Sequence, residues 1–239
     1  MKTHFQSILE FAESFEVKSY NGNLENIFET DNELMIFRTS LITEEVEELC
    51  EAIKNKDIIE TIDALIDILY VGYGAYAALN IDADVELNTK VANELCERIY
   101  NEYKDDTYNI FSDMTIVKFQ QKALVISKNE LQDTVIEKNI NKFLEALKEL
   151  MANTYRALMT FRINTNKAFQ IVHDSNMSKL CVSEAESIET VASYKSDKRY
   201  DSPAYRESKA KGKWIVYNKS TSKILKSINY TPANFSELL

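Results

Sequence analysis

Residues 84–162 contain neither glycine nor proline, and apolar side chains recur through them at helical spacing. Proline breaks a helix and glycine weakens one, so a stretch of this length without either is typical of long α-helices. We expect helices over 85–103, 113–127 and 131–162. With only four glycines and two prolines in 239 residues, the whole chain is predicted to be all-α.

The segment before this stretch also has helical periodicity. Three helices are expected there: one over 5–17, one opened by a Thr30-Asp31-Asn32-Glu33 capping box and ending near Lys54, and one over 58–79. Asn80 is a plausible left-handed stop for the last of them. Gly72 and Gly74 interrupt it, which indicates that another backbone passes close by, through helix packing or a dimer contact.

The last third of the chain changes character. Residues 212–217 alternate as in a strand, so a short β-hairpin is expected within a mostly irregular tail. Residues 195–226 carry a formal charge of +7, whereas the whole chain carries −10. A cationic segment therefore faces an acidic body.

Composition limits the classes of function. A net charge of −10 argues against general affinity for nucleic acid backbones or anionic membranes, so a nucleic-acid partner is unlikely on these grounds and no membrane partner is expected. The three cysteines are an odd, widely spaced set, which favours reduced thiols over zinc or disulfides. There is no signal-like stretch or membrane-length apolar segment, so we expect a cytoplasmic protein, in the host cytoplasm if it is viral.

Two acidic signatures stand within the predicted helices: Glu44-Glu45-Val46-Glu47-Glu48, and Glu60-Thr61-Ile62-Asp63. On a helix, residues three apart share a face, so each signature presents a pair of carboxylates. The two pairs can converge on one point if a cation neutralises them. Oxygen ligands without histidine or thiolate favour magnesium, manganese or calcium.

A solvated acidic helix face is the alternative for either signature alone. The second signature changes this balance, because Asp63 and Asp67 are embedded among apolar residues, where a purely structural helix rarely places repeated carboxylates. Buried carboxylates need a partner. The sequence thus predicts a metal site that handles phosphates.

The run from Phe37 to Asp82 resembles the all-α nucleoside triphosphate pyrophosphohydrolases, through Arg38, the two acidic signatures and Asp67-Ile68-Leu69-Tyr70-Val71. That superfamily includes MazG-like enzymes, dimeric dUTPases and phosphoribosyl-ATP pyrophosphohydrolase. The resemblance implies a four-helix unit, usually in a homodimer or homotetramer. It also implies that Mg²⁺, with Mn²⁺ as a possible substitute, is bound by Glu45, Glu48, Glu60 and Asp63.

A second resemblance lies in the last third. His173-x-x-Asn176-Met177-Ser178-Lys179 is similar to the signature of a phage and large-virus branch of MazG-like proteins, and Tyr230-Thr231-Pro232 is similar to their tail. We expect one MazG-like domain over 1–239, with a phosphate-facing segment over about 165–239. A helical insertion over about 84–164 is far longer than the usual connection in this family.

The resemblance implies hydrolysis of a nucleoside triphosphate between the α and β phosphates, giving a monophosphate and pyrophosphate. Glu44 or Glu48 is the candidate general base, although a base cannot be separated from a metal ligand within one carboxylate cluster. Candidate substrate-binding residues are Arg38, Asp67, His173, Asn176, Lys179, Lys213, Lys223 and Lys226. Structural roles remain open for several of these: ion pairing for Arg38, packing for His173, and a solvated loop for the three tail lysines.

Two functions compete at this stage. The first is a Mg²⁺-dependent nucleotide pyrophosphohydrolase that cleanses or regulates the (deoxy)nucleotide pool. The second is a noncatalytic helical module that senses a nucleotide or binds a partner, with the long middle helices as its surface. Product formation separates the two, because a ligand stabilises a folded protein whether or not it is turned over.

Overall fold

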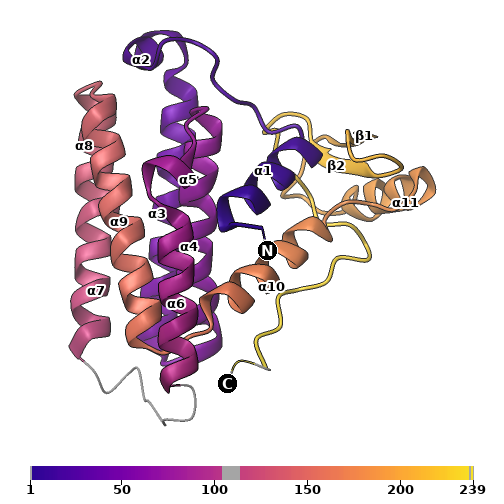
Figure 1. Cartoon of the computed structure of the whole chain (residues 1–239). Helices are drawn as coiled ribbons and strands as arrows, with labels where there is room; N and C mark the ends of the chain where they lie inside the picture. Colours follow the sequence, from indigo (N-terminus) through magenta and orange to yellow (C-terminus); the bar gives the residue numbers. More distant parts are fainter. Residues whose placement is uncertain (1, 104–113, 237, 239) are drawn as a thin grey trace.

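The computed structural model describes residues 2–103, 114–236 and 238, which form a helical protein with a small two-stranded sheet (Figure 1). The helices before the long middle segment are α1 (His4–Ser14), η1 (Leu24–Asn26), α2 (Ile27–Thr30), α3 (Asn32–Asn55) and α4 (Ile58–Ala78). The middle segment contains α5 (Ala83–Glu86), α6 (Thr89–Tyr103), α7 (Met114–Val125), a π-helical turn η3 (Ile126–Glu130), α8 (Leu131–Ile136) and α9 (Ile140–Thr160). The last third contains α10 (Thr165–Met177), α11 (Glu184–Tyr194), β1 (Pro203–Glu207) and β2 (Trp214–Asn218).

Helix α4 is the centre of the fold. It forms a hairpin with α3 and also packs against α1, α9 and α10. The Asp57 side chain caps its start by accepting hydrogen bonds from the backbone N–H groups of Ile59 and Glu60. Its end is marked by Asn80 in the left-handed region, with φ of 57°, as the sequence predicted.

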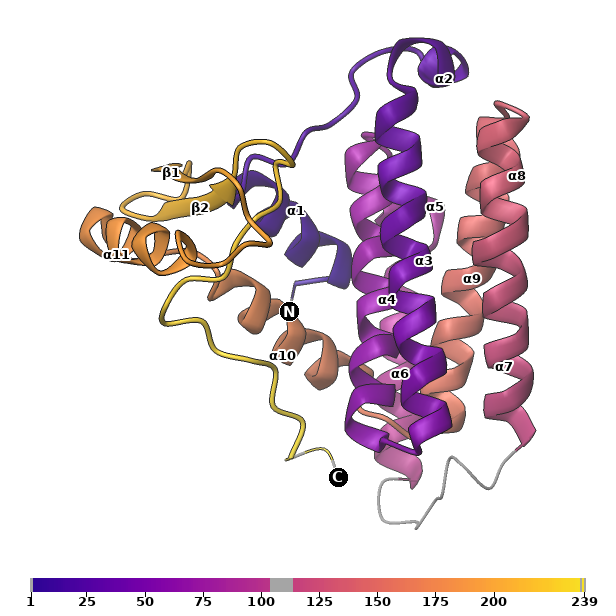
Figure 2. The same ribbon diagram turned by 180° about the vertical axis from the view of Figure 1, so that it is seen from behind.

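The long middle segment completes the helical bundle. Helix α7 packs against α3, and α9 packs against α4. Helix α6 contacts both α9 and α10 (Figures 1 and 2). Gly72 of α4 permits the close approach of α9, because a Cβ there would lie 2.9 Å from the Met151 sulfur. The predicted close helix packing at Gly72 is thus confirmed, but the expected neighbouring backbone is not found there, since the nearest atoms belong to the Met151 side chain.

Four details of the sequence prediction are wrong. Residues 85–103 are not one helix, since Asn88 adopts a left-handed φ of 50° between α5 and α6. Residues 131–162 are not one helix, since Lys138 adopts a left-handed φ of 55° and Asn139 then caps α9 by accepting from the Lys142 N–H. Thr30 does not open α3, because it ends α2 and donates its hydroxyl to the Asn26 carbonyl. Helix α11 was not foreseen. Asp113, the first residue of another predicted helix, lies outside the described residues.

The last third is built on α10, which crosses α1 and α4. The predicted hairpin is confirmed: β1 and β2 are antiparallel, with Tyr205 opposite Val216, and α11 packs on both strands. Ile215 of β2 packs against Phe15 at the end of α1. The chain after β2 then runs back along α10 (Figure 2). In the described part of the chain, no helix is long and apolar enough to cross a membrane.

Candidate active site

The predicted carboxylates meet along the seam between α3 and α4. This acidic seam consists of Glu44, Glu45, Glu48, Glu60, Asp63 and Asp67. Glu45 of α3 lies near Asp67 of α4, and Glu48, one turn further along α3, lies near Glu60 and Asp63. The helices form a hairpin, so a step toward the C-terminus on α3 is matched by a step toward the N-terminus on α4. The structure therefore brings both acidic signatures to one place.

The two deepest carboxylates are held in an environment that opposes ionisation. Burial raises the pKa of Glu45 to about 9, and Asp67, Glu48, Glu44 and Asp63 add like-charge repulsion. Burial also raises the pKa of Asp67 to about 8; Asp63 and Glu48 add to this effect, while Lys179 opposes it. Without a cation, this pair retains protons at neutral pH.

The outer carboxylates are more accessible. Asp63 is half-buried, and burial together with Glu60 and Glu48 raises its pKa to about 6. Burial raises the pKa of the exposed Glu48, and the neighbouring Glu44 and Glu60 raise it further. Glu44 and Glu60 are exposed. The seam therefore runs from the less accessible pair, Glu45 and Asp67, to exposed carboxylates at its edge.

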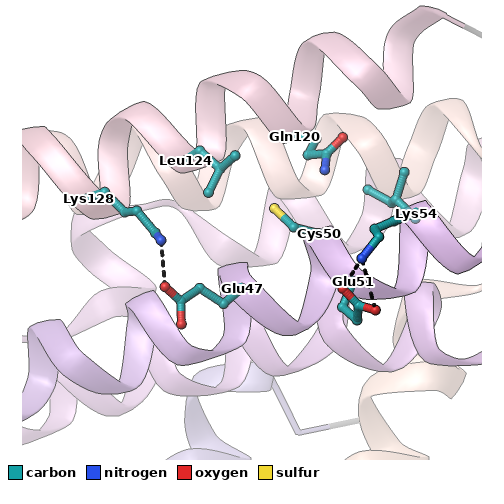
Figure 3. A pocket seen from close by; sticks show the side chains of 8 residues that line it. Glu47, Cys50, Glu51, Lys54, Gln120, Leu124 and Lys128 are labelled. Atoms are coloured by element: carbon teal, nitrogen blue, oxygen red, sulfur yellow. Dashed lines mark hydrogen bonds and ion pairs between the residues drawn. The ribbon is translucent and has the colours of Figure 1, made fainter.

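One acid of the first signature does not belong to this cluster. Glu47 faces α7 instead, and its carboxylate is 2.6 Å from the Lys128 ammonium (Figure 3). It lines an open groove of about 540 Å³ with Cys50, Gln120 and their neighbours. The solvated-face alternative therefore describes Glu47, whereas Glu45 and Glu48 face α4.

A half-buried lysine opposes the carboxylates. Lys179 follows α10 directly, and burial lowers its pKa while Asp67 counteracts this effect. Its ammonium donates to the Asn176 side-chain oxygen at 2.5 Å. Asn176 therefore orients Lys179 toward Asp67 and Glu45, which explains why both residues occur in one short motif.

The C-terminal tail adds two more cations. Lys223 faces Glu48 and Lys226 faces Asp63, and each lowers the pKa of the carboxylate it faces. Both lysines are exposed. Lys213 lies elsewhere, at the turn before β2, where its backbone bonds to Ala210 and Ser208. Its contact with substrate stays a prediction.

The tail is held in place by the motif on α10. The Thr231 N–H donates to the Ser178 hydroxyl at 2.9 Å, and the Ser175 hydroxyl bonds to the Tyr230 hydroxyl at 2.9 Å. Lys226 lies over the Tyr230 ring, 4.4 Å from its centre. The two sequence elements that resemble the viral branch therefore contact each other, and their contact delivers the tail lysines to the acidic seam.

His173 lies beneath the site and is only 4% exposed. Its Nε2 is 3.2 Å from a Glu10 carboxylate oxygen, and its Nδ1 is 3.2 Å from the Tyr70 hydroxyl. Lys2 and, to a lesser extent, His173 hold the pKa of Glu10 below its ordinary value. Both ring nitrogens are thus engaged, so His173 ties α10 to α1 and α4, which favours the structural alternative for this residue.

Arg38 lies two turns before Glu45 on α3 and is 7% exposed. Burial lowers its pKa to about 10. Its Nε has no hydrogen-bond partner among the described residues, and Gly74 leaves room beside it, since a Cβ there would be 3.4 Å from Nη1. Among the described residues no carboxylate forms an ion pair with Arg38, which removes the ion-pair alternative. Arg38 is therefore a buried cation in line with the acidic seam.

The donor chemistry of the seam fits a hard divalent cation. The seam offers carboxylate oxygens as ligands. The raised pKa values of Glu45 and Asp63 arise partly from repulsion between neighbouring carboxylates, which a cation relieves. Across residues 2–103, 114–236 and 238, however, no three His, Cys, Asp or Glu side chains already form a group that could hold a metal ion. The carboxylates are the right type of ligand for such a cation, and they lie near one another. Binding the cation requires their side chains to move closer together.

Comparisons with known proteins agree with this arrangement. The family model for phosphoribosyl-ATP pyrophosphohydrolase matches residues 24–92, which span α3, α4 and every carboxylate of the seam. The chain belongs to the MazG-like all-α pyrophosphohydrolase superfamily. The chain is also 31% identical over 241 residues to "Uncharacterized protein L479" of Acanthamoeba polyphaga mimivirus, covering 99% of this chain and 96% of that protein. No solved structure matches it significantly.

The family match indicates a hydrolase of the nucleotide pyrophosphohydrolase kind. One residue near its site, Glu10, was not singled out from the sequence. Tyr70 and Tyr230 were quoted within the matching motifs without a role; Tyr70 is three residues from Asp67 on α4, so helical spacing could have placed it near the site. Glu10 is distant in sequence and carried no such signal.

Proposed function

We propose that this protein is a Mg²⁺-dependent nucleoside triphosphate pyrophosphohydrolase that cleaves a (d)NTP to a (d)NMP and pyrophosphate, and so cleanses or regulates the nucleotide pool. The observation that supports this most is the juxtaposition of the carboxylate seam with Lys179, Lys223 and Lys226. A site with both signs of charge suits a metal-bound polyphosphate, because the carboxylates hold the cation and the lysines neutralise phosphate oxygens.

In this proposal the cation is held by Glu45, Glu48, Glu60 and Asp63. Mg²⁺, or Mn²⁺ in its place, neutralises phosphate charge and lowers the pKa of bound water. The exposed Glu48 or Glu44 accepts the proton of the attacking water. For Glu48 the raised pKa supports that role, since it makes the carboxylate a stronger base at neutral pH.

The remaining residues position the substrate. Lys223 and Lys226 are exposed on a tail docked at the seam, where they can follow the phosphates. Lys179 and Asp67 are half-buried neighbours, and Asn176 orients the Lys179 ammonium. Arg38 has a buried, unpartnered Nε at the far end of the seam, which suits contact with a phosphate oxygen.

The assembly we propose is a homodimer or homotetramer in the cytoplasm of the cell, or of the host cell. Helix α3 carries two exposed apolar side chains near its start, Ile36 at 52% and Phe37 at 51% exposure. Such neighbours are typical of contact surfaces. Size-exclusion chromatography with light scattering measures the assembly directly.

The function is tested by incubating the protein with each ribo- and deoxyribonucleoside triphosphate and Mg²⁺ and identifying the products by ³¹P NMR. The proposal predicts monophosphate plus pyrophosphate. Diphosphate plus inorganic phosphate would contradict the assigned reaction. Mg²⁺-dependent thermal stabilisation by nucleotides without any product would instead support the noncatalytic module.

A further inference from the structure

The seam between α3 and α4 continues beyond its carboxylates. The two helices are antiparallel, so the residues before Glu44 on α3 and those after Asp67 on α4 lie at the same end of the seam. Residues 34–43 and 68–78, which form this end, contain a single charged side chain, that of Arg38. Helical spacing places five of these residues on the faces that carry the carboxylates, and we call them the Phe37 section: Phe37, Arg38, Leu41, Val71 and Gly74.

Phe37 is on the carboxylate side of α3. It precedes Glu44 by seven residues and Glu48 by eleven, and both intervals return a helix to nearly the same face. Its neighbour Ile36 precedes Glu47 by eleven residues, so Ile36 shares the face that turns toward α7. The two apolar side chains are equally exposed, at 51% and 52%, but only that of Phe37 is on the face of the acidic seam.

The Phe37 ring is held in place by Arg38. The guanidinium carbon of Arg38 is 5.5 Å from the ring centre, a distance at which the π electrons of the ring attract a cation. Arg38 is buried, whereas half of Phe37 is exposed. The ring therefore offers an open, flat apolar surface whose position is fixed from below.

Beside Arg38, helix α4 presents open space instead of a side chain. A Cβ at Gly74 would meet one neighbouring atom within 4 Å, the Arg38 Nη1 at 3.4 Å. Gly72 differs, because a Cβ there would collide with Met151 of α9. A glycine inside a helix is destabilising relative to alanine. Packing within the chain explains this cost at Gly72 but not at Gly74, where the bare helix leaves room for a group that the chain does not supply.

A buried polar atom at the same place has no partner. Arg38 is 7% exposed, and its Nε finds no hydrogen-bond acceptor among the described residues. Buried polar atoms are normally paired, so this one calls for an acceptor from a ligand. The exposed Phe37 ring and the open surface at Gly74 both adjoin this one guanidinium. Three separate observations thus mark one place.

The other end of the seam is polar. Around the turn between α3 and α4, residues 54–57 are exposed and consist of two lysines, an asparagine and an aspartate. Lys223 and Lys226 of the tail face the carboxylates Glu48 and Asp63, which are nearest to this turn. Phosphate groups suit this end. The base of a nucleotide is separated from its phosphates by the ribose, so it lies at the opposite, Phe37 end of the same seam.

We propose that the Phe37 section is the nucleobase site of this protein. The base stacks on the Phe37 ring, the ribose lies over Gly74, and the Arg38 Nε donates to an oxygen of the α-phosphate. Every base has a π-face, and no side chain of the section apart from Arg38 can form hydrogen bonds with the edge of a base. The site therefore accepts purine and pyrimidine nucleoside triphosphates alike. This inference rests on the proposed function for the position of the triphosphate.

The test is calorimetric titration of the full-length protein, with Mg²⁺, against analogues of adenosine and cytidine triphosphate whose α–β bridge is a methylene group. Inorganic tripolyphosphate, which has no base, is titrated in parallel. Phe37→Ala should raise Kd for both analogues about tenfold, because a base loses its stacking partner, and should leave Kd for tripolyphosphate unchanged. The matched control is Ile36→Ala, which removes an equally exposed apolar side chain from the other face of α3 and should change none of the three values.

Fluorescence gives a readout of stacking itself, because a stacked base quenches tryptophan emission. Both analogues should quench the emission of Phe37→Trp, and tripolyphosphate should not. The wild type, whose single tryptophan is Trp214, gives the background. Ile36→Trp is the matched control and should show no quenching above that background.

Four results would overturn the inference: no binding of either analogue, an unchanged Kd for the analogues in Phe37→Ala, an equal loss of tripolyphosphate binding in that variant, or no quenching in Phe37→Trp. If light scattering shows that Phe37→Ala changes the assembly while Kd for the analogues stays the same, Phe37 belongs to a contact between copies instead. The titrations involve no turnover, so the two proposals fail separately. Binding through Phe37 without product formation contradicts hydrolysis alone, and hydrolysis with an unchanged KM in Phe37→Ala contradicts the base site alone.

Discussion

Raising the pH from 6.5 to 8 without divalent cations is expected to destabilise the folded protein. The pKa of Glu45 is raised to about 9 and that of Asp67 to about 8, through burial first and neighbouring carboxylates second. In the unfolded chain such groups titrate near pH 4. The folded state therefore binds more protons than the unfolded state throughout this window, so the free energy of unfolding falls as the pH rises.

The size of the effect follows from the number of protons retained. For each proton that the folded state retains, the free energy of unfolding falls by about 1.4 kcal/mol per pH unit, or about 2 kcal/mol across this window. Glu45 and Asp67 titrate as a pair, so one proton is the conservative count. The window begins at pH 6.5 because burial lowers the pKa of His4 to about 3, and this group gives the opposite slope at lower pH.

Urea unfolding in EDTA at four pH values across the window measures this slope. Replacing both members of the pair, Glu45→Gln with Asp67→Asn, should flatten it, because burial alone keeps the pKa of either remaining carboxyl raised. Glu47→Gln, which faces α7, should keep it. Adding Mg²⁺ at pH 8 should restore stability to the wild type, since a cation that binds the folded state stabilises it. A wild-type stability that is constant or rises from pH 6.5 to 8, or an equal slope in the variant that lacks both carboxyls, would refute the reasoning.

Two further predictions concern packing and the tail. Gly72→Val should lower the free energy of unfolding by about 1–3 kcal/mol by overpacking Met151, whereas Gly74→Ala should leave it unchanged or raise it by up to about 1 kcal/mol; equal losses by urea unfolding would contradict this. Ser178→Ala should expose residues 223–231 to limited proteolysis and raise KM for the nucleotide, since it removes the acceptor for the Thr231 N–H. Ser193→Ala, which loses only a bond within α11, is its control, and equal proteolysis of the two variants would count against tail docking.

Helical spacing was sufficient to predict the acidic seam. Positions 45 and 48 of α3, and 60, 63 and 67 of α4, repeat at three and four residues, so one face of each helix collects them. Spacing alone did not assign Glu47 to α7, because that required knowing which helix covers the other face of α3. The break before α9 was also missed, since Lys138 adopts the left-handed conformation without the glycine that usually signals it.

Lys179, Lys223 and Lys226 were foreseen as candidates from the resemblance and from the charge excess of the last third, but their placement was not. They are about 110 to 180 residues from the seam in sequence, and local pattern carries no information about which carboxylate each of them faces. The docking of residues 227–231 on Ser175 and Ser178 shows which lysines reach the carboxylates. The hydrogen-bond network of Glu10, His173 and Tyr70 likewise depends on three separate helices.

The central claim is that the carboxylates facing α4 perform hydrolysis, and one matched pair of variants tests it most directly. Pyrophosphate release with Mg²⁺ should fall about a hundredfold or more in Glu48→Gln, as for loss of a metal ligand or general base, and should remain near wild type in Glu47→Gln, one residue away on the other face of α3. Circular dichroism should show both variants folded. Full activity in Glu48→Gln, or equal losses in the two variants, would contradict the account.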